Sequence, residues 1–507
     1  MTGSDPAAGA ATSTGPDPAA GAATSHDPGR KVPAPDRTTW DLAVIGAGIA
    51  GLTLAHDVTR SGRSVVLLEA SGRVGGLVSP LSLSLVGGSG SADGGADGGV
   101  RTGPVLLDGG AEAMGTRRPA AIELAEELGL AIERPAAGSW VQPAAGPARP
   151  VPPRSLLGVP SDLAHPLVAQ ILGERAARRA AEADSAGRAG ALPGSASLAD
   201  VVRYAMGEDV LERLVRPIAG ALHASDPEEL AIDVVAPGLR AALAESGSLS
   251  TAVASLVGEG PAVATVRGGM HLLPATLARA AVAAGAEIRT GAAVERLVRD
   301  GGAWQLQVAP GGTLRAREVV LAVPGPEALR MVEPEFPTAR EVRLVPGAPV
   351  EHRTLILDAP ALDRAPRGSG VIVGEGAEPG GRAVRAKALT HSSAKWPWVA
   401  AALGGRHAVR LSYGRPGEEP RLPGVDEALA DAAALLGVDL TAAQLLATAP
   451  ISHGGALAPQ TPGMRETVTD LAATAAERDL HLAGAWVAGT GLPAVVAHAR
   501  RLARRLV

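Results

Sequence analysis

The chain has 507 residues and nearly balanced charge, with 47 basic and 52 acidic side chains and a net charge of −5, which gives no reason to expect a nucleic acid as partner. It contains no cysteine, which excludes disulfides, thiolate metal sites and cysteine nucleophiles. Its 11 histidines show no ligand spacing, so no metal site is expected. The length exceeds what one core can hold, so two or three domains are expected.

The first segment, residues 1–37, is rich in Pro, Ala, Gly, Ser and Thr and contains a partial internal duplication. It lacks large apolar side chains, so we expect it to be disordered. It also lacks the apolar core of a secretory signal, and no run of 18 apolar residues occurs anywhere in the chain. These features favour a cytoplasmic protein without a membrane span. A second stretch, Gly87–Gly99, is predicted to be a flexible hairpin tip enlarged by glycines, and a third, Arg178–Gly194, to be an exposed loop.

A glycine-rich turn follows the first apolar run, Leu42–Ile45, which fits a buried strand. The turn leads into a helical pattern over residues 49–58, and three glycines complete the pattern G-x-G-x-x-G: Gly46, Gly48 and Gly51. Glycines at this spacing allow a tight turn, close approach of the backbone to a pyrophosphate, and close packing of helix on strand. The free N–H groups and positive dipole end of the helix then face the phosphates.

An acidic residue, Glu69, ends the second apolar run at residues 64–68. A carboxylate at this place accepts hydrogen bonds from the ribose hydroxyls of an adenine dinucleotide. Strand, glycine turn, helix, strand and acidic residue thus occur in order within one βαβ unit of about 30 residues, which predicts a dinucleotide site. Residues 69–76 continue as E-x-x-x-R-x-G-G, in which Arg73 can reach a phosphate with a planar fork of donors.

Beyond this unit, strands and helices are interspersed. Helices are expected at residues 119–128, 162–181, 198–203, 208–221, 235–244, 273–284, 425–436 and 493–506. Strands are expected at residues 105–107, 287–290, 304–308, 315–323, 353–357, 370–373, 386–390, 408–413 and 481–483. Aromatic residues are scarce, so the core must be built from Leu, Val, Ile and Ala. Only three basic residues are lysine: Lys31, Lys387 and Lys395.

The E-x-x-x-R-x-G-G pattern resembles the FAD-binding signature of the flavoprotein group that contains amine oxidases, carotenoid desaturases and protoporphyrinogen oxidases. Later segments, by their order and spacing, resemble its porphyrinogen-oxidase branch: residues 105–119, 151–160, 211–230, 267–277, 392–415 and 482–493. Within them, residues 392–396 and 409–415 look like paired strands of the substrate sheet. Residues 456–463 match the family only partly, because Thr461 and Met464 stand where a tyrosine and a histidine are usual.

The resemblance implies a mixed α/β (α+β) fold, in which a Rossmann-type FAD-binding domain is joined to a sheet-based substrate domain and a helical subdomain. We expect residues 1–37 to be a tail and residues 38–116, 260–325 and 464–507 to form the FAD-binding domain. Residues 117–234 would form the helical subdomain, and residues 235–259 and 326–463 the substrate-binding domain. Near the C-terminus, a helix starting near Pro493 would present backbone N–H groups to the negative charge of a reduced flavin.

The resemblance also implies which residues bind. The predicted cofactor contacts are Gly46, Gly48, Ile49, Ala50, Gly51, Glu69, Ala70, Arg73, Gly76, Leu77, Gly110, Ala111, Glu112, Ala113, Val294, Thr490, Gly491 and Leu492. The candidate partners of substrate carboxylates are Arg213, Arg216, Lys395 and Arg410, of which Lys395 and Arg410 are preferred because they fall in strands of the expected substrate sheet. No catalytic residue is named, because aromatisation of a macrocycle supplies the driving force.

The function implied is oxidation of coproporphyrinogen III to coproporphyrin III in haem biosynthesis. Six electrons would leave in three two-electron steps, each reoxidised by O2 to give H2O2. The partners would be a porphyrinogen and O2, with transient contacts to neighbouring haem-pathway enzymes. Protoporphyrinogen IX is the alternative substrate. A flavin amine oxidase, with Trp486 in an aromatic cage, a carotenoid desaturase, and a flavoprotein-like scaffold without chemistry are the remaining alternatives.

Overall fold

The computed structural model describes residues 39–85, 104–187, 196–223, 225–345, 347–415, 417–457 and 461–507. The predicted tail at residues 1–37 and the predicted loop at Gly87–Gly99 lie outside these ranges. The described residues from Thr39 onward belong to one structural unit. None of the described helices is long and apolar enough to cross a membrane.

The first sheet contains the βαβ unit that the sequence predicts. Five of its strands run parallel: β12 (Glu287–Arg289), β2 (Val65–Leu68), β1 (Trp40–Ile45), β15 (Thr313–Leu321) and β21 (Leu480–Leu482). The sheet order is β12-β2-β1-β15-β14-β13, with β21 paired to β15. The antiparallel strands β14 (Ala303–Ala309) and β13 (Ala293–Asp300) extend it beyond β15. In the centre, Val44 on β1 pairs with Leu67 on one side and Val320 on the other.

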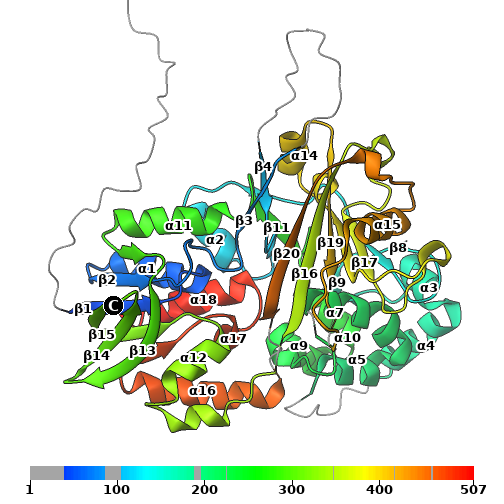
Figure 1. Cartoon of the computed structure of the whole chain (residues 1–507). Coiled ribbons are helices and arrows are strands. Elements are labelled where there is room, and N and C mark those ends of the chain that lie inside the picture. The colour runs from blue at the N-terminus through cyan, green and yellow to red at the C-terminus, as the bar shows by residue number, and fades with distance from the viewer. Residues whose placement is uncertain are drawn as a thin grey trace, which may run out of the picture. The chain divides into compact units, whose positions relative to one another are not determined.

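Helices cover both faces of the first sheet, as Figure 1 shows. One face packs Leu42 and Val44 against α1 (Ile49–Thr59), α2 (Ala120–Glu127), α11 (Leu272–Ala283) and α18 (Leu492–Ala503). The other face packs Ala43 and Ile45 against α12 (Gly325–Val332) and α16 (Pro462–Ala476), with the 3-10 turn η2 (Pro337–Glu341) beside them. Burial on both faces explains why the central strands are continuously apolar over residues 42–45 of β1 and 65–68 of β2 rather than alternating.

A second sheet has the strand order β20-β16-β19-β18-β17-β7-β8. Its strands are β20 (Leu445–Leu457), β16 (Ala348–Leu357), β19 (His407–Tyr413), β18 (Ala388–His391), β17 (Gly370–Val373), β7 (Trp140–Gln142) and β8 (Arg149–Pro150). One face is apolar and packs Leu355 and Leu411 against α15 (Val425–Leu436). The short turns η3 (Pro360–Leu362), η4 (Pro379–Gly381) and η5 (Ala442–Gln444) join these elements.

The opposite face of the second sheet changes character along its strands. At one end, Ile356 and Ala408 pack with Trp396 and with the hairpin β3 (Pro80–Leu83) and β4 (Val105–Asp108). Further along the same strands, the residues of matching parity are polar: Thr354 and Arg410 pair in register, and so do His352 and Ser412. This polar end of the sheet carries the charged residues of the candidate site.

The remaining elements form a helical part and small connections. The helices of this part share a separate apolar core with the hairpin β9 (Ser155–Leu156) and β10 (Val159–Pro160). They are α3 (Pro166–Leu172), α4 (Glu174–Ser185), α5 (Leu198–Met206), α6 (Glu208–Val210), the π-helix η1 (Leu211–Val215), α7 (Arg216–His223), α8 (Ile232–Val235), α9 (Leu239–Ser246) and α10 (Leu249–Leu256). A small sheet joins β5 (Met114–Gly115), β11 (Val263–Val266) and β6 (Ile132–Glu133). The short helices are α13 (Ser392–Lys395), α14 (Pro397–Leu403) and α17 (Ala485–Ala488).

The mixed α/β class is confirmed, and several element predictions are corrected. Residues 178–185 of the predicted loop Arg178–Gly194 are the end of helix α4, and residues 188–194 lie outside the described residues. The predicted helix 162–181 is broken at Gly173, whose φ of 85° ends α3 and begins α4. Residues 392–395 form the helix α13 instead of a strand. Helices α10, α12 and α16 and strands β13 and β20 were not predicted from the sequence.

Candidate functional site

The glycine turn places its three glycines under three different constraints. Gly46 has a φ of +102°, and a Cβ on it would lie 2.7 Å from the carbonyl oxygen of Ala322. A Cβ on Gly51 would lie 1.9 Å from the carbonyl oxygen of Gly46, because helix α1 starts so close to strand β1. A Cβ on Gly48, in contrast, would meet no atom within 4 Å. The position at which the motif requires room for a pyrophosphate is therefore the open one.

Glu69 and the residues that follow strand β2 pack against this turn. One carboxylate oxygen of Glu69, Oε2, accepts the Ala47 N–H at 2.8 Å, and Oε1 accepts the N–H of Ser71 at 2.8 Å. Gly75 donates its N–H to the Ala47 carbonyl at 2.8 Å and forms a β-bridge with Gly48. Both Nη atoms of Arg73 donate to the Gly76 carbonyl at 3.0 Å. The E-x-x-x-R-x-G-G segment thus forms the second wall of the cradle, with Ala70, Gly76 and Leu77 exposed along it.

A third segment, residues 108–113, follows strand β4 and is tied to the second wall. Gly109 donates to the Ser79 carbonyl at 2.7 Å, and Ala111 donates to the Leu77 carbonyl at 3.2 Å. A Cβ on Gly110 would lie 1.7 Å from the Leu77 carbonyl oxygen, so the backbones could not approach this closely with any other residue there. The predicted contacts at 110–113 therefore lie next to those at 76–77.

Asp108 anchors the start of this third segment to helix α11. Its carboxylate accepts the N–H groups of Met270 and His271 at 2.9 and 3.0 Å, and the His271 ring at 2.8 Å. Asp108 is buried, so these partners satisfy a carboxylate that would otherwise be costly to bury.

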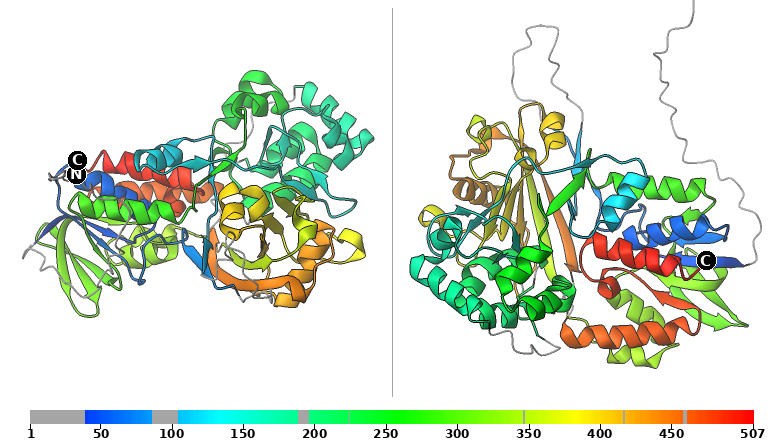
Figure 2. Two further views of the ribbon diagram at one scale, coloured as in Figure 1. Left: turned by 90° about the horizontal axis from the view of Figure 1, so that it is seen from above. Right: turned by 180° about the vertical axis from the view of Figure 1, so that it is seen from behind.

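The C-terminal motif places Thr490, Gly491 and Leu492 at the start of α18, which lies beside α1 in Figures 1 and 2. Gly491, at the N-cap, has a φ of 97° that favours glycine. Thr490 Oγ1 lies 3.2 Å from Nδ1 of His223 at the end of α7, a contact that sequence reasoning missed. Burial, together with the charge of Arg117, lowers the pKa of His223 to about 4. This histidine is therefore neutral at pH 7.

Two further predicted cofactor contacts, Ile49 and Ala50, are the first residues of α1, and Val294 is buried on β13. Ala292, two residues before Val294, donates its N–H to the main-chain carbonyl of Glu69 at 2.8 Å. The strand that carries Val294 therefore begins beside the acidic residue of the cradle.

The structure brings together three residues that the sequence analysis had assigned to different roles. Lys395 Nζ lies 2.7 Å from Oε1 of Glu112, and Nη2 of Arg410 lies 3.3 Å from Oε2. The three side chains are 10–16% exposed. Burial alone would raise the pKa of Glu112, but the charges of Lys395 and Arg410 outweigh it and lower this pKa to about 2. Two cations thus surround one carboxylate, which leaves one positive charge in excess.

Two histidines on the same face of the second sheet were not predicted. Nδ1 of His352 lies 3.0 Å from the hydroxyl of Ser412, and burial, reinforced by the charges of Arg410 and Lys387, holds the pKa of His352 well below its usual value. Burial and the charge of Arg73 also lower the pKa of His453 on β20. Both rings are neutral at pH 7, so the excess positive charge beside Glu112 comes from Lys395 and Arg410.

The other two carboxylate-binding candidates make their contacts within the helical part. Arg216 pairs with Glu212 at 2.8 Å and also contacts Asp226. Arg213 donates to the Leu172 carbonyl at 2.9 Å and lies 3.8 Å from Asp209. These contacts give both arginines partners without a substrate.

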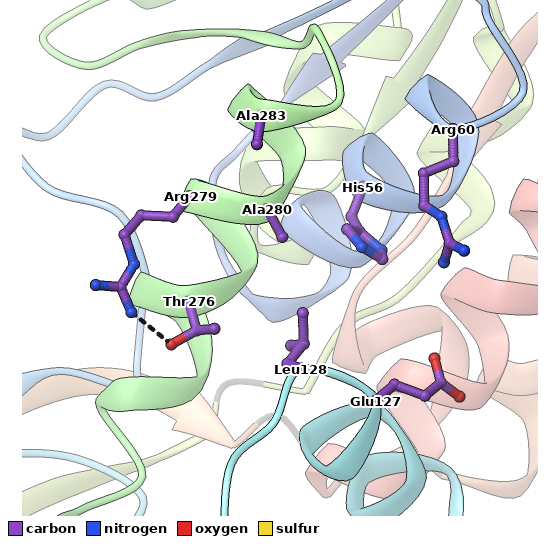
Figure 3. Close-up of a pocket in the computed structure, with 8 residues that line it drawn as sticks. All are labelled: His56, Arg60, Glu127, Leu128, Thr276, Arg279, Ala280 and Ala283. Atoms are coloured by element: carbon purple, nitrogen blue, oxygen red, sulfur yellow. Dashed lines mark hydrogen bonds between the residues drawn. The ribbon is translucent and has the colours of Figure 1, made fainter.

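A separate surface cavity of about 520 Å³ lies between α1, α2 and α11 (Figure 3). Its lining residues are His56, Arg60, Glu127, Leu128, Thr276, Arg279, Ala280 and Ala283. His56 and Arg60 lie at the C-terminal end of α1, whereas the glycine turn is at its N-terminal end. The cavity is thus distinct from the dinucleotide cradle.

The open position at Gly48, the carboxylate of Glu69 and the two further walls fit an adenine dinucleotide. The chain belongs to the flavin containing amine oxidoreductase family, whose sequence profile matches residues 49–507. A flavin carried on a dinucleotide fold is FAD, so the chain is an FAD-dependent oxidoreductase.

Individual relatives extend this assignment. The chain is 29% identical over 482 residues to a coproporphyrinogen III oxidase of Mycobacterium tuberculosis, covering 92% of this chain and 96% of that protein. It is 22% identical over 394 residues to a coproporphyrinogen III oxidase of Bacillus subtilis, covering 75% of this chain and 78% of the relative.

Solved structures share the fold. A provisionally assigned protoporphyrinogen oxidase from Exiguobacterium superposes with a TM-score of 0.73 at 21% identity, covering 92% of this chain and 98% of the other. Wild-type putrescine oxidase bound to putrescine superposes with a TM-score of 0.62 at 16% identity, covering 92% of this chain and 99% of the other.

Proposed function

We propose that the chain is an FAD-dependent oxidase that converts coproporphyrinogen III to coproporphyrin III in haem biosynthesis. The observation that carries the proposal is the alignment with relatives of that name over almost the full length of both chains. The overall reaction balances as coproporphyrinogen III + 3 O2 → coproporphyrin III + 3 H2O2. Bound FAD supplies the two-electron acceptor that O2 reoxidises after each of three steps.

In this proposal the three walls of the cradle hold the cofactor. The N–H groups at the start of α1 and the open backbone at Gly48 would receive the pyrophosphate. Oε1 of Glu69 accepts both the N–H and the hydroxyl of Ser71, so the remaining lone pair of Oε2 would accept a ribose hydroxyl. Residues 110–113 and the start of α18 would line the flavin ring. A helix start stabilises the negative charge that a reduced flavin carries.

The polar end of the second sheet would receive the macrocycle. Its side chains place an excess positive charge beside residues 110–112, which favours a substrate with carboxylates over a cationic amine. Lys395 has two ammonium hydrogens beyond the one directed at Glu112. These are the donors that a propionate group would use.

One observation weakens the amine oxidase alternative. An aromatic cage needs an aromatic face open to the substrate, whereas Trp486 is buried in the core beside the first sheet. A Cβ on Gly325 would lie 3.1 Å from its ring. The single tryptophan that the sequence offered for a cage is therefore used in packing.

The test is to supply coproporphyrinogen III and protoporphyrinogen IX separately to the purified flavoprotein in air. We expect porphyrin fluorescence to appear with three H2O2 per porphyrin, and kcat/KM to be higher for the tetra-acid. A preference for protoporphyrinogen IX would reassign the substrate. Oxidation of simple amines without porphyrin formation would refute the proposal, and a protein purified without flavin would indicate a scaffold.

A further inference from the structure

Arg410 makes an unusual set of contacts for a residue expected to bind substrate. It lies on β19 in the interior of the second sheet, paired in register with Thr354 on β16 and Thr390 on β18. Its Nη1 donates to the Gly110 carbonyl at 2.9 Å and reaches the Asp108 carbonyl at 3.5 Å. Its Nη2 faces Glu112 at 3.3 Å. One guanidinium group therefore contacts three alternate residues of the segment 108–112.

The same segment is bonded on its other side to the dinucleotide cradle. Gly109 and Ala111 donate to the carbonyls of residues 79 and 77, and Gly75 donates to Ala47 in the glycine turn. A chain of hydrogen bonds thus runs from Arg410 through the 108–112 segment and residues 75–79 to the pyrophosphate loop. Lys395 fixes the second oxygen of Glu112, so neither end of that carboxylate is free to turn.

We infer that Arg410 is a positioning residue, which holds the flavin-lining backbone at residues 110–112 through the Gly110 carbonyl and the Glu112 carboxylate. This role rests on the proposed function, because that proposal places the flavin beside residues 110–113. A guanidinium group suits it, since its planar fork donates in two directions at once while an ammonium acts as a point charge. The fork is 10% exposed, so its carbonyl and carboxylate partners replace water.

The test compares R410M and R410K with matched variants of Arg353. Arg353 lies on the neighbouring strand β16 but on the opposite face of the sheet, where its Nε donates to the Pro423 carbonyl at 2.8 Å. The first measurements use substrate-free protein: the dissociation constant of FAD from the reconstituted apoprotein, and the visible circular dichroism of the bound flavin. The second set of measurements is kcat and KM for each porphyrinogen.

We expect R410M to raise the FAD dissociation constant by about tenfold or more, because a change of this size corresponds to the loss of one hydrogen bond to a charged group. The variant should also change the circular dichroism of the bound flavin. R410K should recover only part of both, whereas R353M and R353K should leave both unchanged. If R410M does not fold, E112Q tests the same link at nearly constant volume and should alter the flavin dichroism in the same direction.

The inference is overturned if R410M or E112Q keeps the FAD dissociation constant within twofold and the dichroism unchanged. A selective rise in KM for the tetra-acid with those flavin properties unchanged would assign Arg410 to a substrate propionate instead. Because the flavin measurements need no porphyrinogen, they stand even if the enzyme proves to oxidise another substrate.

Discussion

Gly48 offers the sharpest test of the cradle, because the cofactor and the fold make opposite demands on it. Its φ of −73° and ψ of −180° suit any residue, and a Cβ there would meet no protein atom within 4 Å. Gly48→Ala should therefore leave the apoprotein as stable as the wild type, or stabilise it by about 0.4–1 kcal/mol through the unfolded chain.

The same Cβ would occupy the space that the motif keeps for the pyrophosphate. Each hydrogen bond to a charged group contributes about 1.5–3 kcal/mol, so displacing two of them costs about 3–6 kcal/mol. That corresponds to a loss of FAD affinity of about a hundredfold or more. Gly48→Val, with a larger side chain at the same point, should abolish FAD retention during purification.

The assay is reconstitution of apoprotein followed by flavin fluorescence, with thermal unfolding of the apoprotein measured in parallel. Gly51→Ala is the matched control, because its Cβ would lie 1.9 Å from the Gly46 carbonyl oxygen. That variant should lose stability even without FAD. The reasoning is refuted if Gly48→Val binds FAD within about threefold of the wild-type affinity, a difference of less than 1 kcal/mol.

Four further outcomes follow from the sequence and the structure. Glu69→Ala should weaken FAD binding by about 1–3 kcal/mol in the same titration and, unlike Gly48→Ala, also lower apoprotein stability, because the carboxylate holds the Ala47 N–H. The pKa of Glu112 is lowered from 4.5 to about 2, so the ionised carboxylate adds about 3 kcal/mol to the free energy of unfolding above pH 4.5, and this stabilisation is lost as the pH falls towards 2. Denaturant unfolding of E112Q at several pH values should lack this pH-dependent component. The pKa of His223 is lowered from 6.5 to about 4, so as the pH falls the unfolded chain binds a proton at this residue before the folded chain does. The free energy of unfolding should therefore decrease by about 3 kcal/mol from pH 6.5 to pH 4, and this decrease should be smaller in H223Q. Deleting residues 1–36 should leave the flavin-to-protein absorbance ratio and the turnover unchanged, and a large loss of either would show a role for that segment.

The cradle was predictable because its determinants are local. The strand, glycine turn, helix and acidic residue follow one another within residues 40–69. The backbone requires glycine at positions 46 and 51, and the space for a pyrophosphate favours it at position 48. Helix α15 and strand β17 were also placed at their observed bounds, residues 425–436 and 370–373, because each has a clear apolar pattern and a glycine at its start.

Strand β20 was missed for a physical reason. Its sequence is rich in small residues and contains Pro450, which lacks the N–H that an interior strand must donate. The strand lies at the edge of the second sheet, where Pro450 pairs with Arg353 on β16 and is tolerated. Only the pairing with β16, which the sequence does not display, identifies these residues as a strand.

The charged cluster was beyond sequence reasoning because it depends on distant segments. Glu112 was predicted as a cofactor contact, and Lys395 and Arg410 as substrate contacts, since each matched a different segment of the family. The structure shows that they satisfy one another. His352 could have been suspected from its alternation with Thr354 on one strand face, but nothing in the sequence indicates that His453 lies on the same face.

The scarcity and burial of lysine have a practical consequence. Of the three lysines, Lys387 is 5% exposed and Lys395 is tied to Glu112, while Lys31 lies outside the described residues. An acylating reagent specific for amines would therefore find little to react with on the described surface while the protein is folded. Acylation at residues 387 and 395, read by mass spectrometry, would therefore report opening of the segments beside strand β18 and in helix α13 that carry them. Slower acylation after saturation with FAD would report that the cofactor closes this region as well as its own cradle.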